Sequence, residues 1–78
     1  MTPKIPAVTP RQAIAALKKA GFYVHHQKGS HITLKHASNP AKRVTVPYHN
    51  RDLNRKTLAS ILDQAGLTNE EFVALLRQ

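Results

Sequence analysis

The sequence predicts an α+β fold in which helices cover one face of a three-stranded antiparallel sheet. Two observations lead to this class. Residues 22–47 contain three successive segments that alternate apolar and polar residues, which is the pattern of strands with one buried face. Residues 10–20 before them and 55–76 after them place apolar residues at helical spacing. The expected order is therefore α-β-β-β-α-α, and the 78 residues form a single domain.

The first helix is expected to follow an extended lead-in of residues 1–8. Thr9 can cap the helix, Pro10 suits its first position, and Gln12 can reach back to the cap. Gly21 is a suitable residue to end it. The predicted apolar face consists of Ala13, Ile14, Ala16, Leu17 and Ala20.

The three alternating segments predict which strand residues are buried. Gly29 can take a positive φ, so we expect a hairpin turn between the first two strands. The predicted buried set is Phe22, Val24, Ile32, Leu34, Val44 and Val46. The other face is expected to carry Tyr23, His25, Gln27, His31, Thr33, Lys35, Arg43 and Thr45. A slip of one residue in a strand would exchange the two sets.

Two further helices are expected after the sheet. Asn54 can cap a helix that runs to Ala65, where Gly66 stops it. Thr68 and Glu71 have the spacing of a capping box at the start of a last short helix. The predicted apolar residues of the two helices are Leu58, Ile61, Leu62, Ala65, Phe72, Val73, Leu75 and Leu76.

The composition narrows the class of partner. Twelve Lys and Arg residues against four Asp and Glu residues give a formal net charge of +8. Such a charge attracts nucleic acid or an acidic protein. The chain has no cysteine, which excludes disulfides and thiolate metal sites and is consistent with the cytosol. We expect no metal site, no cofactor, no membrane span and no signal peptide.

The residues Lys28-Gly29-Ser30-His31 are the main candidates for chemistry. Histidine is the side chain that exchanges protons near neutral pH, and the alternation places His31 on the open face. Cleavage of RNA without a metal needs a base for the ribose 2′-OH and cations for the phosphate oxygens. His31 can serve as the base, with Lys35 and Arg43 in register on the same face. An ordinary surface histidine near a turn is the alternative.

Other basic residues are candidates for phosphate contacts. Arg55 and Lys56 begin a helix, where a bound phosphate would offset their repulsion by the helix dipole. Alternatively, both side chains simply extend into solvent. His49 precedes that helix and is either a second proton carrier, a phosphate contact or a hydrogen-bonded loop residue. His26 and His36 are expected on the apolar side, as structural residues.

Several of these residues together resemble a known family. They are Gly21-Phe22, Lys28-Gly29-Ser30-His31, Val44-Thr45-Val46-Pro47 with His49, Thr57-Leu58, Ile61-Leu62 and Ala65-Gly66. This set is similar to the HicA toxins of bacterial HicA–HicB toxin–antitoxin modules, from Arg11 to Leu76. The resemblance implies a fold like that of double-stranded-RNA-binding domains and mRNA cleavage through His31. It also implies a HicB antitoxin that binds the toxin and masks this histidine.

The leading hypothesis is therefore a cytoplasmic, metal-independent endoribonuclease toxin that forms a hetero-oligomer with its antitoxin. His31 is its expected general base. The expected RNA-binding residues are Lys28, Gly29, Ser30, Lys35, Arg43, His49, Arg55 and Lys56. Two alternatives stay open, namely a noncatalytic RNA-binding domain of the same fold and a basic module that binds an acidic protein.

Overall fold

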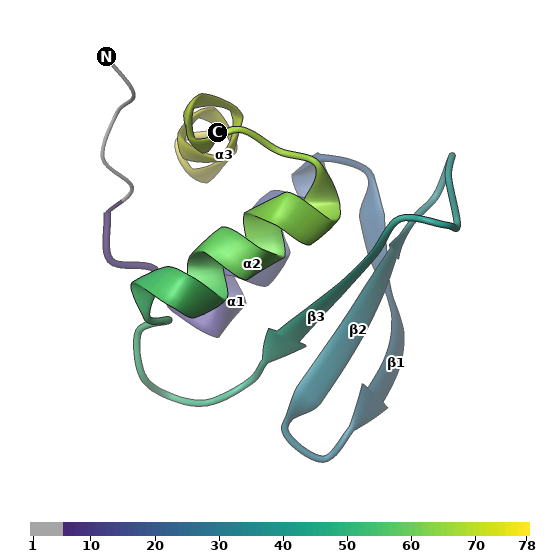
Figure 1. Ribbon diagram of the computed structural model, residues 1–78, viewed down its shortest axis with the longest axis horizontal. Helices are drawn as coiled ribbons and strands as arrows, with labels where there is room; N and C mark the ends of the chain where they lie inside the picture. Colours follow the sequence, from purple (N-terminus) through teal and green to yellow (C-terminus); the bar gives the residue numbers. More distant parts are fainter. Residues whose placement is uncertain (1–5) are drawn as a thin grey trace.

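The computed structural model describes residues 6–78, and its helices and strands follow the predicted order (Figure 1). The elements are α1 (Pro10–Lys19), β1 (Phe22–Lys28), β2 (His31–His36), β3 (Arg43–Pro47), α2 (Arg55–Ala65) and α3 (Asn69–Leu76). The α+β class and the additional C-terminal helix are confirmed. Of the predicted lead-in, residues 1–5 lie outside the described residues, and residues 6–8 form neither helix nor strand.

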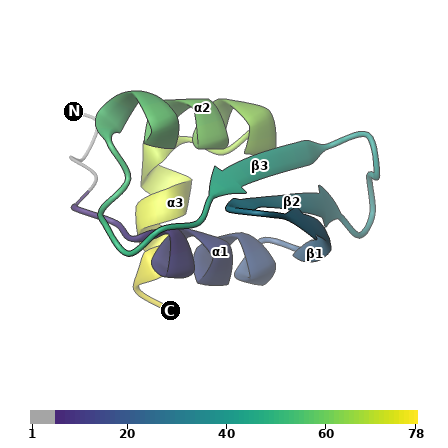
Figure 2. The ribbon, with the colours of Figure 1, turned by 90° about the horizontal axis from the view of Figure 1, so that it is seen from below.

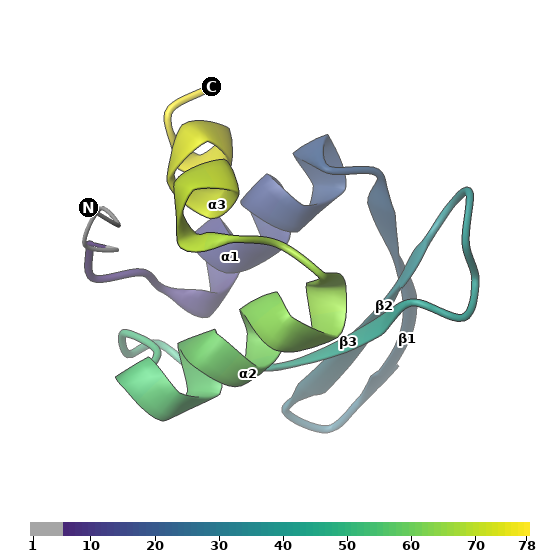
Figure 3. The ribbon, with the colours of Figure 1, turned by 45° about the horizontal axis from the view of Figure 1, so that its top comes forward.

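The molecule has two layers, a sheet and a group of helices. The strands are antiparallel in the order β1-β2-β3. Helix α1 packs against β1 and β3, α2 packs against β3, and α3 packs against α1. Figures 2 and 3 show the three helices on one side of the sheet. The other side of the sheet has no helix over it in the described part of the chain.

The helix ends form as their local sequences predict. Thr9 and Gln12 make a reciprocal capping box at α1, and Thr68 and Glu71 make another at α3. The backbone N–H of Thr68 donates to Glu71 Oε1 at 2.9 Å, and this bond holds the pKa of that carboxyl below its usual value. Gly66 ends α2 with a φ of 71°, in the left-handed region.

The hydrophobic core draws residues from every helix and strand and also from two loops. Its side chains with less than 2% exposure include Leu17, Leu34, Val44, Val46, Ile61 and Phe72. Val8 and Leu53 belong to the same core, although neither lies in a helix or strand. The Leu53 N–H donates to the Val8 carbonyl oxygen at 2.7 Å. The lead-in and the β3–α2 connector therefore hold one another against the core.

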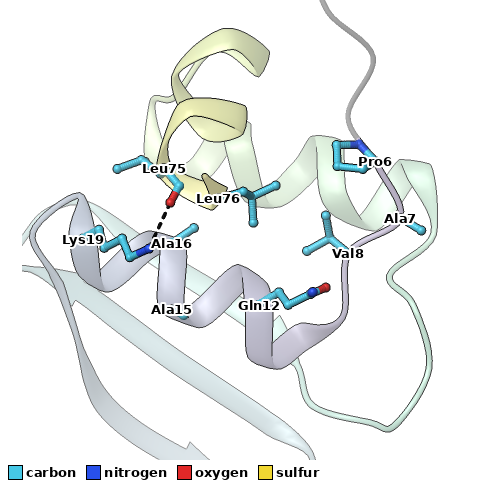
Figure 4. Close-up of a pocket in the computed structure, with 9 residues that line it drawn as sticks. All are labelled: Pro6, Ala7, Val8, Gln12, Ala15, Ala16, Lys19, Leu75 and Leu76. Carbon is cyan, nitrogen blue, oxygen red and sulfur yellow. Dashed lines mark hydrogen bonds between the residues drawn. The ribbon is translucent and has the colours of Figure 1, made fainter. Parts of the chain in front are cut away.

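Helix α3 is joined to α1 by polar as well as apolar contacts. Phe72 is fully buried, and Leu75 and Leu76 are half-buried against the core. Lys19 Nζ donates to the carbonyl oxygens of Leu75 and Gln78, the first at 3.3 Å (Figure 4). A lysine at the carboxyl end of a helix satisfies carbonyls that have no partner within the helix.

No helix in residues 6–78 combines the length and the apolarity that crossing a membrane requires.

Strand β1 contains a bulge that the sequence analysis did not predict. Val24 pairs with Leu34, but the next pair is His26 with Thr33, so His25 is an extra residue. An inserted residue moves the rest of the strand to the opposite face. His26 therefore lies on the open face and Gln27 on the core side, and both predictions for these side chains were wrong.

The prediction that Val24 is buried was also wrong, because its side chain is 42% exposed. Val24 lies on the core side, since it pairs with the fully buried Leu34. It belongs to an edge strand, however, and the helices pack more closely over the opposite edge, where α2 covers β3. The other five strand residues predicted to be buried are buried. Lys35 and Thr45 lie on the face predicted for them, but they are half-buried and not exposed as we would expect of an uncovered face.

The two valines Val44 and Val24 offer a matched test of this core. Val44→Ala should lower the free energy of unfolding by about 2 kcal/mol or more, because its side chain is fully buried. Val24→Ala removes the same atoms from a side chain that also lies on the core side of the sheet. Because Val24 is largely exposed, this change should lower the free energy of unfolding by about 1 kcal/mol or less. Urea unfolding followed by circular dichroism measures both. Equal losses would mean that the helices cover β1 as fully as β3.

Candidate functional site

The side of the sheet that faces away from the helices forms the candidate site, and we call it the open face. Side chains directly opposite one another in paired strands share a face. His31, Thr33 and Lys35 alternate with the buried Ile32 and Leu34, so they and their partners lie on the open face. The members are Tyr23, His26, Lys28, His31, Thr33, Lys35, Arg43, Thr45 and Pro47.

His31 follows directly after a tight turn. Gly29 and Ser30 form the two-residue loop, and Lys28 pairs with His31 across it. Gly29 has a φ of 57°, whereas no non-glycine residue in the described chain has a positive φ. A positive φ at only the first of two central residues matches a type II′ hairpin turn, which requires glycine there. The turn leaves His31 exposed at the end of the sheet, beside Lys28.

The connector that follows β3 is fastened to this turn. His31 pairs with Pro47, and the Tyr48 N–H donates to the Ser30 carbonyl oxygen. His49 comes next, and its Nδ1 accepts a hydrogen bond from the Arg51 N–H at 3.1 Å. In a neutral imidazole this bond leaves the proton on Nε2. The structure thus brings the loop of His49 to the same end of the sheet as His31.

The charge on the open face is positive throughout. Lys28, Lys35 and Arg43 are its charged residues, and none of the members defined above is acidic. All four acidic residues lie between positions 52 and 71, in the connector and the α2–α3 part of the chain. Lys35 pairs directly with Arg43. Lys35 and His31 are four positions apart in β2, which corresponds to about 13 Å along the strand.

Arg55 and Lys56 are not part of this face. They are exposed residues in the first turn of α2, which belongs to the helical layer (Figure 1). Asn54 caps that helix through a hydrogen bond from the Thr57 N–H at 2.8 Å. The structure therefore brings Lys28, Gly29, Ser30, Lys35 and Arg43 onto one surface with His31, but it leaves Arg55 and Lys56 apart.

His36 is a structural residue, as its predicted position on the apolar side implied. Its Nε2 lies 3.1 Å from the Ala20 carbonyl oxygen, and its Nδ1 accepts from the Ser38 N–H. Its ring meets Phe22 edge-on at 5.0 Å. Gly21 has a φ of 101°, and a Cβ there would lie 2.8 Å from His36 Nε2. This contact explains why a glycine joins α1 to β1.

The helical layer offers less for chemistry. A groove of about 290 Å³ lies between the lead-in, α1 and α3 (Figure 4). Its lining includes Val8, Ala16 and Leu76, with Gln12 and Lys19 as the polar side chains and no histidine or carboxylate. Nowhere in residues 6–78 do three histidine, aspartate or glutamate side chains gather closely enough to hold a metal ion. The open face is the surface that combines a proton-exchanging side chain with cations.

Comparison with known proteins relates the chain to one family. A family model described as HicA toxin of bacterial toxin-antitoxin matches residues 10–67. The match begins with α1, includes all three strands and ends just after α2, so α3 lies beyond it. No curated protein matches the chain.

The turn before His31 generates a prediction about glycine. Gly29→Ala should destabilise the protein by about 1–2 kcal/mol, because a side chain disfavours the positive φ of Gly29 even though no atom lies within 4 Å of the added Cβ. Ser30→Ala, at the neighbouring position of the same turn, should change stability by less than about 0.5 kcal/mol. Chemical denaturation of both variants tests this, and equal effects would contradict a specific need for glycine.

Proposed function

The chain belongs to the HicA family of toxins from bacterial toxin–antitoxin modules, and from this premise we propose that it is an endoribonuclease that cleaves mRNA in the cytoplasm. The observation that carries the proposal is the exposure of His31 on a cationic face that has no acidic member. Such a face attracts a polyanion and places a proton acceptor against it.

In the proposed reaction the neutral imidazole of His31 takes the proton from a ribose 2′-OH. The 2′ oxygen attacks the adjacent phosphorus, the bond from phosphorus to the 5′ oxygen breaks, and that oxygen takes up a proton. Negative charge accumulates on the other phosphate oxygens as the attack proceeds. Lys28, which pairs with His31, is the nearest cation in the sheet register to stabilise it. DNA lacks the 2′-OH and is therefore not cleaved.

Other residues are proposed to hold the RNA in place. The backbone N–H groups of Gly29 and Ser30 are the turn's hydrogen-bond donors beside His31, and Lys35 and Arg43 offer positive charge further along the open face. His49, with Arg51 fixing its Nδ1, presents Nε2–H as a donor to a phosphate oxygen. Arg55 and Lys56 lie off this face and would contact phosphates further along the chain of the RNA.

The reaction is proposed to need no metal, since cations of the protein supply the positive charge. The test compares cleavage of a single-stranded RNA by this chain and by His31→Ala, with a chelator present in both assays. His31→Ala should lose at least about 10²–10⁴ in rate, the usual contribution of a positioned general base. Its circular dichroism should be unchanged, because His31 is exposed and outside the core.

His36→Ala is the matched control for losing an imidazole. It removes a histidine from the other end of β2, where the ring packs on Phe22. It should lower stability while the folded fraction keeps its activity. Full activity in folded His31→Ala would refute the role of His31. RNA binding without cleavage by the unsubstituted chain would favour a noncatalytic RNA-binding domain.

Membership of the family also implies an antitoxin partner. We propose that this partner is of the HicB type, forms a hetero-oligomer with the toxin and covers His31. To do so it needs carboxylates opposite the open face and enough apolar area to exclude water. RNA and antitoxin would then use the same cations, so their binding should be mutually exclusive.

Charge reversal tests this shared surface. The double variant Lys35→Glu, Arg43→Glu should both weaken RNA binding and slow antitoxin association, by about tenfold or more at low salt. Arg11→Glu, Lys18→Glu changes the net charge equally at exposed positions of α1 and should have much smaller effects. Association rates by surface plasmon resonance and RNA affinity by fluorescence anisotropy measure both. A loss of RNA binding without slower antitoxin association would separate the two surfaces.

A further inference from the structure

The bulge in β1 changes which side chains reach the open face. In the bulge two residues of β1, His25 and His26, lie opposite the single residue Thr33. The two residues of such a bulge do not alternate as regular strand residues do, because the extra residue turns the local backbone. Tyr23 lies two residues before His25, opposite Lys35 on the open face. Tyr23, His25 and His26 are therefore three exposed rings within four residues of an edge strand.

Two of these rings already meet at a defined angle. The centroids of Tyr23 and His25 are 6.4 Å apart, and their planes are 80° from parallel. Both side chains are exposed, Tyr23 by 44%. Exposed tyrosine rings are the usual platforms on which unpaired bases stack. A flat ring that enters this corner can stack on one of the two rings and present its edge to the other.

The surroundings of the corner are those of a polyanion site. Lys35 is the cross-strand neighbour of Tyr23, and Arg43 is the next residue in the same row. Lys28 and His31 form the row at the other end of the face. Lys35 and His31 are about 13 Å apart along β2, so the corner lies within a short stretch of extended nucleic acid from His31. Cations thus lie beside Tyr23 across the sheet, at Lys35 and Arg43, and beyond the bulge along β1, at Lys28.

We propose that Tyr23, together with His25 and His26, forms a base-stacking subsite that holds an unpaired base of the RNA a short stretch along the strand from the cleaved phosphate. This inference rests on the proposed function, because it assumes an RNA substrate at His31. Phosphates contact Lys35 and Arg43 in the row of Tyr23, and Lys28 nearer to His31. The base between them stacks on Tyr23, while the imidazoles of His25 and His26 meet its edge, where hydrogen bonds can select the base.

The geometry favours single-stranded RNA as the occupant. Bases within a duplex are stacked on one another and cannot lie against a protein ring, whereas bases of a single strand can turn outward and stack on tyrosine or histidine. Tyr48, the other exposed tyrosine, lies in the connector after β3, with its backbone N–H bonded to Ser30. The ring of Tyr23, by contrast, lies beside the exposed ring of His25, and Tyr23 shares its row of the sheet with Lys35 and Arg43.

The experiment measures binding in the His31→Ala protein, so that RNA is not cut. The probes are fluorescent oligo(A), oligo(U) and a sugar–phosphate chain of the same length without bases. Adding Tyr23→Ala should weaken binding of at least one of the two oligonucleotides by about 5- to 100-fold, the usual range for loss of one stacked base. Binding of the chain without bases should not change. Tyr23→Phe should restore binding, since it keeps the ring.

Two control variants separate stacking from other effects. Val24 lies in the same strand as Tyr23 and is about as exposed, but its side chain is on the opposite side of the sheet. Val24→Ala should therefore leave the affinities for all three probes unchanged. Lys35→Ala should weaken binding of all three probes alike, because it removes a charge and not a ring. Deletion of His25, which restores the regular register, should resemble Tyr23→Ala.

The outcomes distinguish the two proposals. If oligo(A) and oligo(U) bind but Tyr23→Ala and Val24→Ala have equal effects, the subsite is refuted and the proposed function stands. If neither oligonucleotide binds to the His31→Ala protein, both proposals fall. If Tyr23→Ala weakens only the antitoxin complex, the corner is a protein-binding surface and the subsite is likewise refuted.

Discussion

The structure depends on the alternation of β2, the central strand. Ile32 and Leu34 point into the core, so His31, Thr33 and Lys35 must point away from it. Both neighbouring strands pair with β2 along its length, and their side chains are sorted by the same pleat. Burial of two aliphatic side chains thus fixes the position of the candidate base and of the cations around it. A shift of one residue in β2 would bury His31 and expose Leu34.

The two layers divide the chemistry of the chain between them. The helices and one side of the sheet enclose the core. Among residues 6–78, no polar or charged residue is buried. The acidic residues lie in the connector and in the α2–α3 part of the chain, which leaves the open face purely basic. A basic face with no acidic member repels itself, and a polyanion relieves that repulsion when it binds. Stability comes from one layer, and the attraction for RNA or for an acidic antitoxin comes from the other.

Irregularities at two places in the β1–β2 hairpin shape the candidate site. The turn at Gly29 and Ser30 presents His31 at the end of the sheet, and the bulge at His25 presents three rings further along the edge. The connector after β3 supports the first of these, because Tyr48 donates to the Ser30 carbonyl oxygen. The second lies on an edge strand whose main contact with the helical layer is with α1. The turn is therefore the more constrained part of the site, and substitution at the bulge is expected to cost the fold less.

The sequence by itself determined the features that depend on neighbouring residues. The capping boxes at Thr9 and Thr68, the glycine stop after α2 and the period of the strands are local, so the element order and the place of His31 on the open face could be predicted. What only the tertiary structure decided depends on residues far apart in the chain. The bulge at His25 arises from how β1 pairs with β2, and it reversed the predicted faces of His26 and Gln27. The exposure of Val24 depends on which strands the helices cover, and the burial of Val8 and Leu53 depends on a hydrogen bond between two loops that are 45 positions apart. Periodicity gives the direction of a side chain within its own strand, but pairing and packing decide whether anything lies against it.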